Sequence, residues 1–571
     1  MTEANKSLYA AVLLIFLSGF CAIRAVDRHS LTYDAVKYPA SGYDYLRTLR
    51  LRTDPENPPV GKVLTALPFL IIDADPPQLT DGSDERGFDT GWRFFFRNKV
   101  PGDVLAYYAR LPAVAAGMLL ALTLFLFARR RFSGWGSLVA LVFLLAGPMY
   151  RALTTLATTD IFLALFFLSA VYWLDRELEG ERPNQHYLSG AGIFAAAAVL
   201  TKFSGLLFYP LAAAAVLRRR RLMLGILDLI VLGMPLLILS TMLYGSDFGR
   251  LWEGVLFQKT VLSRGPHLTF FWDVLEKRAW PQYYLVSFFL KTPYPFLLAL
   301  AAGLFFWVRT PERRQIVLVA APFLLFLAAA SGNRFYATRY LFPVYPLLAL
   351  TAAAAWDFGR RRGKVLILIL AAWQVGEAAW AYPHYLSYMN LPWRAQGHRY
   401  LANSDFDWGQ DLPALADFLT LERRPPLQLC YFGTSDPEAW GIEAQQLATV
   451  SKSYVSDTVL PLAPERELLA VSAGCRQYMT VRAGAETLRA WAWLDKRRPI
   501  KVVAGTFFIY DIRDDAEAHG RIGQLHAAQG DLRKALREAQ RVLEIEPGSA
   551  EGKAFLSFVR GRMGGEAGLI Q

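Results

Sequence analysis

Two carboxylates beside apolar segments are the residues of this sequence best suited to acid–base chemistry. Asp34 and Tyr38 are four residues apart, so a helix would place them on one face. A carboxylate just outside a membrane could act as a general base towards a hydroxyl group. Local spacing alone favours a simpler role, that of an acid at a helix N-terminus. Asp160, which follows two threonines, likewise stands where a residue that caps the next helix would stand.

Four cationic residues accompany these carboxylates. Lys62 follows two prolines that fix a turn and begin a helix, so its amine could reach an anion at that helix N-terminus or simply extend to the membrane surface. Lys202 and Lys291 lie between or within very apolar segments, where a lysine needs an anion or contact with water. Arg339 could bind phosphate with its planar guanidinium. Together, these groups would suit a phosphate ester attacked by a hydroxyl group.

Other kinds of site find little support in the sequence. The seven histidines do not cluster at the spacing of metal ligands, so no metal site and no cofactor are predicted, while the use of a divalent metal is left open. No glycine-rich loop of the Walker or dinucleotide form is present. The net charge of +12 comes from short basic clusters between apolar segments, which argues for membrane orientation and against nucleic acid as a partner.

Long apolar segments must position these residues. The 571 residues are 54% hydrophobic, and only 19% are charged. Apolar runs of about 20 residues match the thickness of a bilayer and must be helical there. We expect a mainly α, polytopic membrane protein with about eleven spans, at residues 7–24, 106–128, 134–150, 159–174, 187–201, 203–217, 222–244, 283–308, 314–331, 337–356 and 364–382.

Basic residues in alternate loops predict the orientation. They lie in the connections at 129–131, 176–182, 218–221, 309–314 and 360–364. Because positive charge is retained on the cytoplasmic side, these loops and the N-terminus are predicted to be cytoplasmic. The loops 25–105 and 245–282, and everything after residue 383, would then lie outside.

The predicted chain has three parts. A transmembrane domain over 1–382 includes the long first loop. Short β-rich runs separated by turns predict a small extracytoplasmic α/β domain over 383–515, where Cys430 and Cys475 could form a disulfide or remain two buried thiols. Residues 516–571 form a helical tail, with a helix pair whose Gly523 and Gly530 occupy positions typical of a tetratricopeptide repeat. One repeat cannot form a solenoid, so residues 516–560 would cap the α/β domain or bind a protein partner.

Several short segments, in this order, resemble one known family. They are Tyr33 to Tyr38, Asp54 to Lys62, Thr158 to Asp160, Thr201 to Ser204, Lys291 to Pro293, Arg339 to Pro346, and Asp407 to Leu412. The chain is similar, over about residues 8–515, to the bacterial glycosyltransferases of the protein O-mannosyltransferase and aminoarabinose transferase type. These enzymes have the multi-span GT-C fold and use a phospholipid sugar carrier.

The resemblance implies roles for individual residues. Asp34 would be the catalytic base and Asp160 a second carboxylate of the site. The donor would be a polyprenyl-phosphate sugar in the bacterial inner membrane, and the acceptor a hydroxyl group of a protein, lipid or glycan on the extracytoplasmic face. The substrate-binding residues would be Lys62, Asn57, Tyr38, Lys202, Lys291, Arg339 and Tyr340.

The sequence departs from the family pattern at three positions. Ala35 replaces a glutamate, while Tyr38 and Asn57 replace histidines. Three groups that could bind a metal or shape an acceptor pocket are therefore absent. Two other functions remain open: a non-catalytic protein that binds the carrier lipid and recruits a partner through its tail, and a transporter of lipid-linked sugar.

Overall fold

The computed structural model describes residues 3–79, 86–180, 184–219, 222–309, 316–332, 335, 337–447, 456–483 and 486–567. Parts of the predicted basic loops, at 181–182, 220–221 and 310–314, lie outside these residues. The chain forms two compact units, Met1–Gly397 and His398–Gln571.

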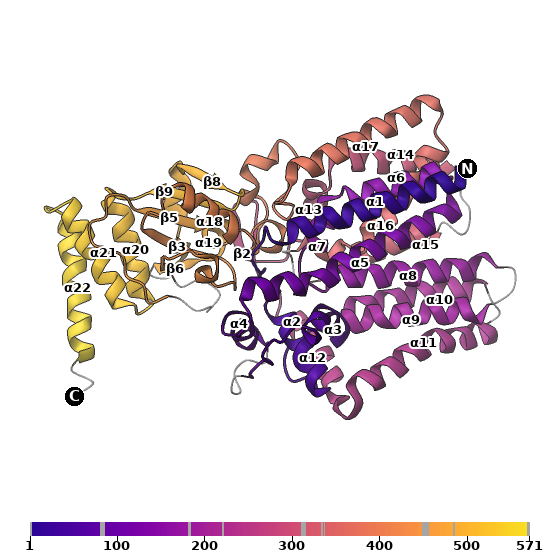
Figure 1. The fold of residues 1–571 in the computed structure, drawn as a ribbon, viewed down its shortest axis with the longest axis horizontal. Coiled ribbons are helices and arrows are strands. Elements are labelled where there is room, and N and C mark those ends of the chain that lie inside the picture. The colour runs from indigo at the N-terminus through magenta and orange to yellow at the C-terminus, as the bar shows by residue number, and fades with distance from the viewer. Residues whose placement is uncertain are drawn as a thin grey trace. The chain divides into compact units, whose positions relative to one another are not determined.

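Helices in the first unit correspond to all the predicted apolar segments. They are α1 (Glu3–Val26), α5 (Gly102–Arg131), α6 (Gly134–Leu145), α7 (Pro148–Thr154), α8 (Asp160–Glu179), α9 (Gln185–Thr201), α10 (Phe208–Arg219), α11 (Leu222–Tyr244), α13 (Tyr283–Lys291), α14 (Tyr294–Arg309), α15 (Ile316–Ala330), α16 (Val344–Asp357) and α17 (Arg361–Ala381). Helix α8 packs against α9, and α9 against α11, as a row of neighbouring rods (Figure 1). The predicted mainly helical, multi-pass membrane fold is confirmed.

The number of spans follows from the length and composition of the helices. By length and composition, four helices within the described residues can cross a membrane, and two bent pairs raise this number to six. The predicted count of eleven therefore stays a prediction.

Two predicted spans are each a pair of helices at an angle. The chain bends by 65° between α6 and α7, and by 111° between α13 and α14. Thr292 lies between α13 and α14 in an extended conformation, with ψ of 120°. A residue before proline is pushed out of the helical region, and Pro293 follows it. Lys291 consequently ends a helix and does not lie within one continuous span.

The long first loop folds into a compact layer of short helices. It contains α2 (Lys37–Thr48), α3 (Pro59–Ala66), the 3-10 helix η1 (Leu67–Leu70) and α4 (Phe88–Phe96). Tyr43, Phe69, Phe94 and Phe95 form its buried aromatic core. The second loop contributes α12 (Gly249–Ser263) and a hairpin of β1 (Leu268–Phe271) and β2 (Val274–Lys277).

The second unit is built on a five-stranded sheet of order β4-β3-β5-β9-β8. Its strands are β3 (Leu427–Cys430), β4 (Gln445–Gln446), β5 (Leu468–Ser472), β8 (Lys501–Val503) and β9 (Phe507–Asp511), accompanied by α18 (Leu412–Leu421), α19 (Ala473–Tyr478) and a hairpin of β6 (Thr480–Ala483) and β7 (Glu486–Arg489). Strand β3 pairs in parallel with β4 and β5, whereas β9 is antiparallel to β5 and β8. Strands β8 and β9 form a hairpin, because Ala504 and Gly505 adopt positive φ and turn the chain. Cys430 and Cys475 are both buried free thiols.

Three helices complete this unit: α20 (Ala516–Ala528), α21 (Leu532–Ile545) and α22 (Ala550–Ala567). Helix α21 packs between the other two (Figure 1). The predicted helix pair corresponds to α20 and α21, and its identity as a tetratricopeptide repeat stays a prediction.

A buried polar network joins these helices to the sheet. Arg537 of α21 forms ion pairs with Glu467, at 2.7 Å, and Glu538, at 2.9 Å. His519 of α20 lies with Nδ1 2.6 Å from a Glu538 oxygen. Gln445 of β4 contacts both Glu538, at 2.8 Å, and the Nε2 atom of His526, at 3.3 Å.

The attachment of α20 and α21 should weaken in acid. Burial lowers the pKa of His526 from 6.5 to about 4. Between pH 6.5 and pH 4, His526 binds a proton more readily in the unfolded state than in the folded state. The contribution of neutral, buried His526 to folding stability is therefore complete above pH 6.5 and is lost as the pH falls towards 4. Hydrogen exchange of residues 516–545, corrected for the intrinsic exchange rate, should show falling protection over this window. His526→Gln should flatten the dependence, whereas replacing the exposed His186 by Gln should not change it; an equal slope in all three proteins would contradict the expectation.

Candidate active site

Arg339 joins two predicted site carboxylates from distant parts of the sequence. Its Nη1 atom lies 2.7 Å from an oxygen of Asp160, and its Nη2 atom lies 3.2 Å from an oxygen of Asp34. Arg339 and Asp160 are buried, whereas the side chain of Asp34 is 21% exposed. Of the two carboxylates held by this guanidinium, Asp34 is therefore the one that a dissolved or membrane-borne reactant can reach.

Lys202 completes this group from the opposite side of Asp160. Its ammonium lies 2.7 Å from the second oxygen of Asp160 and 4.5 Å from the centre of the Tyr340 ring. Lys202 is in an extended conformation between α9 and the 3-10 helix η2 (Phe203–Leu207). Because the helix is broken there, the lysine can turn towards the start of α8.

Asp160 is the first residue of α8, where the helix dipole favours a negative charge. The residue in the capping position is Thr159, whose side chain makes no capping hydrogen bond. Both carboxylate oxygens of Asp160 contact cations. The geometry therefore favours a site residue over the simple cap that local sequence suggested.

A second ionic group lies in the first loop, with Asp54 at its centre. The Asp54 carboxylate is fully buried and lies 3.1 Å from the ammonium of Lys37 and 3.6 Å from that of Lys62. Lys62 also donates to the Asp54 carbonyl oxygen at 2.7 Å, and the Asn57 amide donates to both carboxylate oxygens at 3.3 Å. Lys37 also reaches Glu56, at 3.4 Å. Lys62 and Asn57 thus meet in one cluster, as their shared segment suggested.

Two glycines allow this loop to pack closely. A Cβ atom on Gly42 of α2 would lie 2.0 Å from the Lys62 carbonyl oxygen of α3. A Cβ atom on Gly61 would lie 2.8 Å from the side chain of Thr159, next to Asp160. These close contacts hold α2 against α3, and α3 against the N-terminal end of α8.

Burial sets the protonation of the loop residues. Burial, followed by the charge of Asp34, raises the pKa of Tyr38 well above its ordinary value, so the phenol stays protonated. The charges of Arg339 and Asp54 also act on the pKa of Tyr38, and its ring centre lies 5.2 Å from the ammonium of Lys37. Burial lowers the pKa of Lys62 and raises that of Asp54, while their mutual attraction offsets part of both effects.

Lys291 contacts the backbone that follows α17. This lysine ends α13, and its ammonium donates to the carbonyl oxygen of Leu386 at 2.5 Å. Its predicted substrate-binding role stays a prediction.

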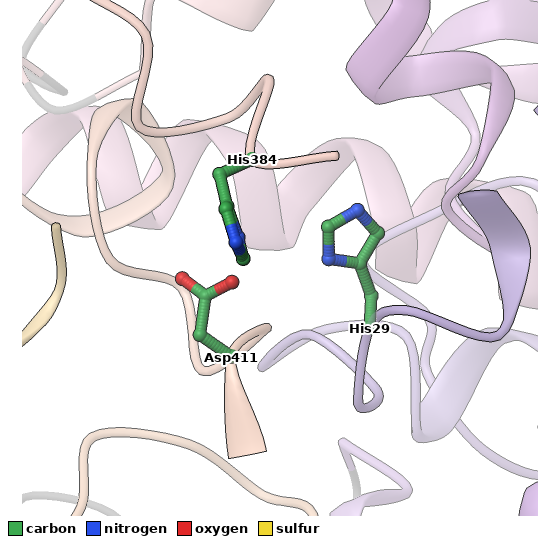
Figure 2. Close-up of side chains that lie close together, drawn as sticks. All are labelled: His29, His384 and Asp411. Carbon is green, nitrogen blue, oxygen red and sulfur yellow. The ribbon is translucent and has the colours of Figure 1, made fainter. Parts of the chain in front are cut away.

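Sequence reasoning assigned no role to two charged residues and two histidines of the first unit. Lys37 and Glu56 were part of the motifs but were assigned no role, although their charges were visible. The imidazoles of His29 and His384, drawn in Figure 2, have ring centres 6.3 Å apart at 70°. Asp411, also labelled there, belongs to the second unit, where it accepts hydrogen bonds from Gln410 and Thr506 at 2.8 Å each.

One segment of the chain matches a known protein family. Residues 92–244 match the family model of dolichyl-phosphate-mannose-protein mannosyltransferases. The predicted resemblance is confirmed. The matched segment contains Asp160 and Lys202, whereas Asp34, Lys62 and Arg339 lie outside it. None of the curated proteins compared matches the chain.

Solved structures of similar architecture include two transferases. Crystalline ArnT from Cupriavidus metallidurans, bound to undecaprenyl phosphate, is 13% identical and matches 88% of this chain and 97% of its own, with a TM-score of 0.48. The oligosaccharyltransferase AglB from Archaeoglobus fulgidus, with an inhibitory peptide and a dolichol-phosphate, is 12% identical over 79% of this chain and 62% of its own, with a TM-score of 0.43.

Replacing Asp54 by Asn should strongly destabilise the first unit. The substitution would leave two buried ammonium groups close together without their shared anion, at a cost of about 3–5 kcal/mol. The thermal unfolding midpoint of the purified protein in detergent measures this loss.

The matched control is Asp73→Asn in the same loop. Asp73 pairs with Lys99, and these side chains are 95% and 46% exposed, so water can solvate the released ammonium and the unfolding midpoint should barely change. Equal losses in the two variants would contradict a central role for Asp54.

Proposed function

We propose that this protein is a GT-C-type glycosyltransferase that moves a sugar from a polyprenyl-phosphate carrier to an acceptor hydroxyl group on the extracytoplasmic face of the membrane. The observation that carries the proposal is the Arg339 bridge between Asp34 and Asp160. It combines a partly exposed carboxylate, which can accept a proton, with a cation that can stabilise phosphate. The match of residues 92–244 to mannosyltransferases supports the same reaction class.

The charges of the site suit this reaction. The two ionic groups contain the cations Lys37, Lys62, Lys202 and Arg339 and the carboxylates Asp34, Asp54, Glu56 and Asp160. These charges balance before a substrate enters. When Asp34 takes the acceptor proton it becomes neutral, while the leaving phosphate gains one negative charge. The total charge is unchanged, and negative charge moves from the base to the phosphate.

Arg339 links these two events. Its guanidinium faces Asp34 before transfer, and it loses that partner's charge when Asp34 is protonated. A cation released in this way can stabilise the phosphate at the moment its charge increases, which is the electrostatic effect that lowers a barrier. Asp160 keeps both Arg339 and Lys202 in place throughout.

One displacement is sufficient for this chemistry. The acceptor oxygen attacks the anomeric carbon, the bond from that carbon to the phosphate oxygen breaks, and Asp34 holds the proton. A single displacement with one base inverts the configuration at the anomeric carbon.

Asp34→Asn should abolish transfer and leave folding intact. The amide cannot accept the proton, but it preserves the size of the side chain. Transfer of labelled sugar from a synthetic polyprenyl-phosphate donor to acceptors in isolated membranes measures the effect, with the unfolding midpoint as a check on folding. Asp89→Asn, at an exposed carboxylate of α4, is the control and should retain activity. Full activity of Asp34→Asn would refute the assignment of the base; donor binding or donor movement without transfer in the unmodified protein would favour a scaffold or a transporter.

Lys202→Met should reduce kcat more than it raises KM. The charge on the leaving phosphate is larger in the transition state than in the bound donor, so loss of a nearby cation should cost about 10²-fold in kcat. Steady-state rates of polyprenyl-phosphate release measure this. Lys99→Met provides the control, because Lys99 is half exposed in the same unit and pairs with Asp73 and Asp75. A pure rise in KM would show that Lys202 contributes only to donor binding.

A further inference from the structure

We propose that the ammonium of Lys37 is a built-in cation that occupies the place of a divalent metal in the first-loop site, and that removing it converts Asp54 and Glu56 into a divalent-cation site. Lys37 would be a positioning residue for Asp34. This inference deepens the proposed function, and its positioning part rests on that function. The cation-site part can be tested without turnover.

The contacts of Lys37 are those of a cation enclosed by anions. Its ammonium lies 3.1 Å from an Asp54 oxygen and 3.4 Å from a Glu56 oxygen, and its side chain is 2% exposed. The rings of Phe88 and Tyr38 lie 5.1 and 5.2 Å from the same ammonium. Carboxylates and π-electron faces therefore surround it, and water has little access.

The local helix does not favour a positive charge at this position. Lys37 is the first residue of α2, where the unpaired backbone amides create a partial positive charge. No acidic residue stands in the first turn of α2. The stabilising anions come from 17 and 19 residues further along the chain. Burial opposes the charged form, yet Asp54, Glu56 and Asp34 together raise the pKa of Lys37 above its ordinary value.

The oxygen atoms around Lys37 are the type that hard divalent cations prefer. Two carboxylates and the neighbouring amide of Asn57 could provide part of an octahedral shell, with water at the remaining positions. With the ammonium in place, a metal would meet a fixed positive charge about 3 Å from the same oxygens, which is strongly repulsive at low dielectric. The residues present therefore do not fit a metal while Lys37 stands there.

Lys37 also controls the segment that carries the proposed base. Its backbone amide donates to the carbonyl oxygen of Asp34 at 3.2 Å, so the turn of Asp34 runs directly into α2. The side-chain ammonium attracts the Asp34 carboxylate as well. A displaced Lys37 would therefore move Asp34 relative to Arg339.

The decisive comparison uses Lys37→Ala and Lys37→Met in the full-length protein. Lys37→Ala leaves space and removes the ammonium that Asp54 and Glu56 share, so that Asp54 keeps Lys62 as its cation. This variant should bind one more Mn²⁺ per chain than the unmodified protein, as measured by paramagnetic resonance titration. The bound Mn²⁺ should raise its unfolding midpoint by about 3 °C or more. Lys37→Met fills the space without charge and should gain neither the ion nor the stabilisation. Adding Glu56→Gln to Lys37→Ala should remove the extra Mn²⁺.

The rate of sugar transfer tests whether Lys37 positions Asp34. Unmodified protein should keep its transfer rate after treatment with a chelator, whereas Lys37→Ala should lose at least about 10-fold in kcat and recover part of it with Mn²⁺. If Lys37→Ala folds poorly, the yield of monodisperse protein should rise when Mn²⁺ is present during purification.

Specific outcomes would overturn the inference. No extra Mn²⁺ on Lys37→Ala would refute the cation site, as would loss of activity of the unmodified protein on chelation with recovery on Mn²⁺ addition. Absence of sugar transfer by the unmodified protein would instead refute the proposed function, because the Mn²⁺ titration does not depend on it.

Discussion

The ion pair between Arg339 and Asp160 is the interaction on which the candidate site depends. Both side chains are buried in a unit built largely of apolar helices. An isolated charge in such surroundings is costly, so each requires the other, and removing one partner would leave an uncompensated charge. This requirement fixes the start of α8 against the segment before α16. Asp34 and Lys202 then attach to the two ends of the same pair.

The first loop also depends on buried charges that need partners, and here the central residue is Asp54. Asp54 accepts contacts from two buried lysines, and Gly42 and Gly61 allow the neighbouring elements to pack closely beside them. The loop is therefore held on the helix ends by charge and by tight backbone contact together. Among the carboxylates of the site, Asp34 and Glu56 retain some exposure, and Asp34 forms an ion pair with Arg339. A reaction at Asp34 can change its charge without disrupting the buried pairs that support it.

In the second unit, buried ion pairs stabilise the fold. Arg537 ties Glu467 and Glu538 together in the interior between the sheet and the helices α20 and α21. All three side chains are buried and mutually paired, so they bind the helices to the sheet in one defined register. In the first unit, by contrast, Asp34 remains reachable, and this difference in exposure separates a candidate reactive group from a structural one.

The sequence alone determined the helical membrane character and most segment positions, and it singled out most of the charged residues of the two ionic groups. Long apolar runs need internally satisfied backbone hydrogen bonds, and that requirement is local, so it can be read without a structure. The break after Lys202 and the proline after Thr292 were equally visible, but the 111° angle between α13 and α14 was not. Only the tertiary structure decided which charges meet. Arg339 and Asp34 are 305 residues apart, and Lys37 finds its anions outside its own helix. Contacts of that kind depend on how helices pack, which local spacing does not specify, and for this reason Lys37 was assigned no role.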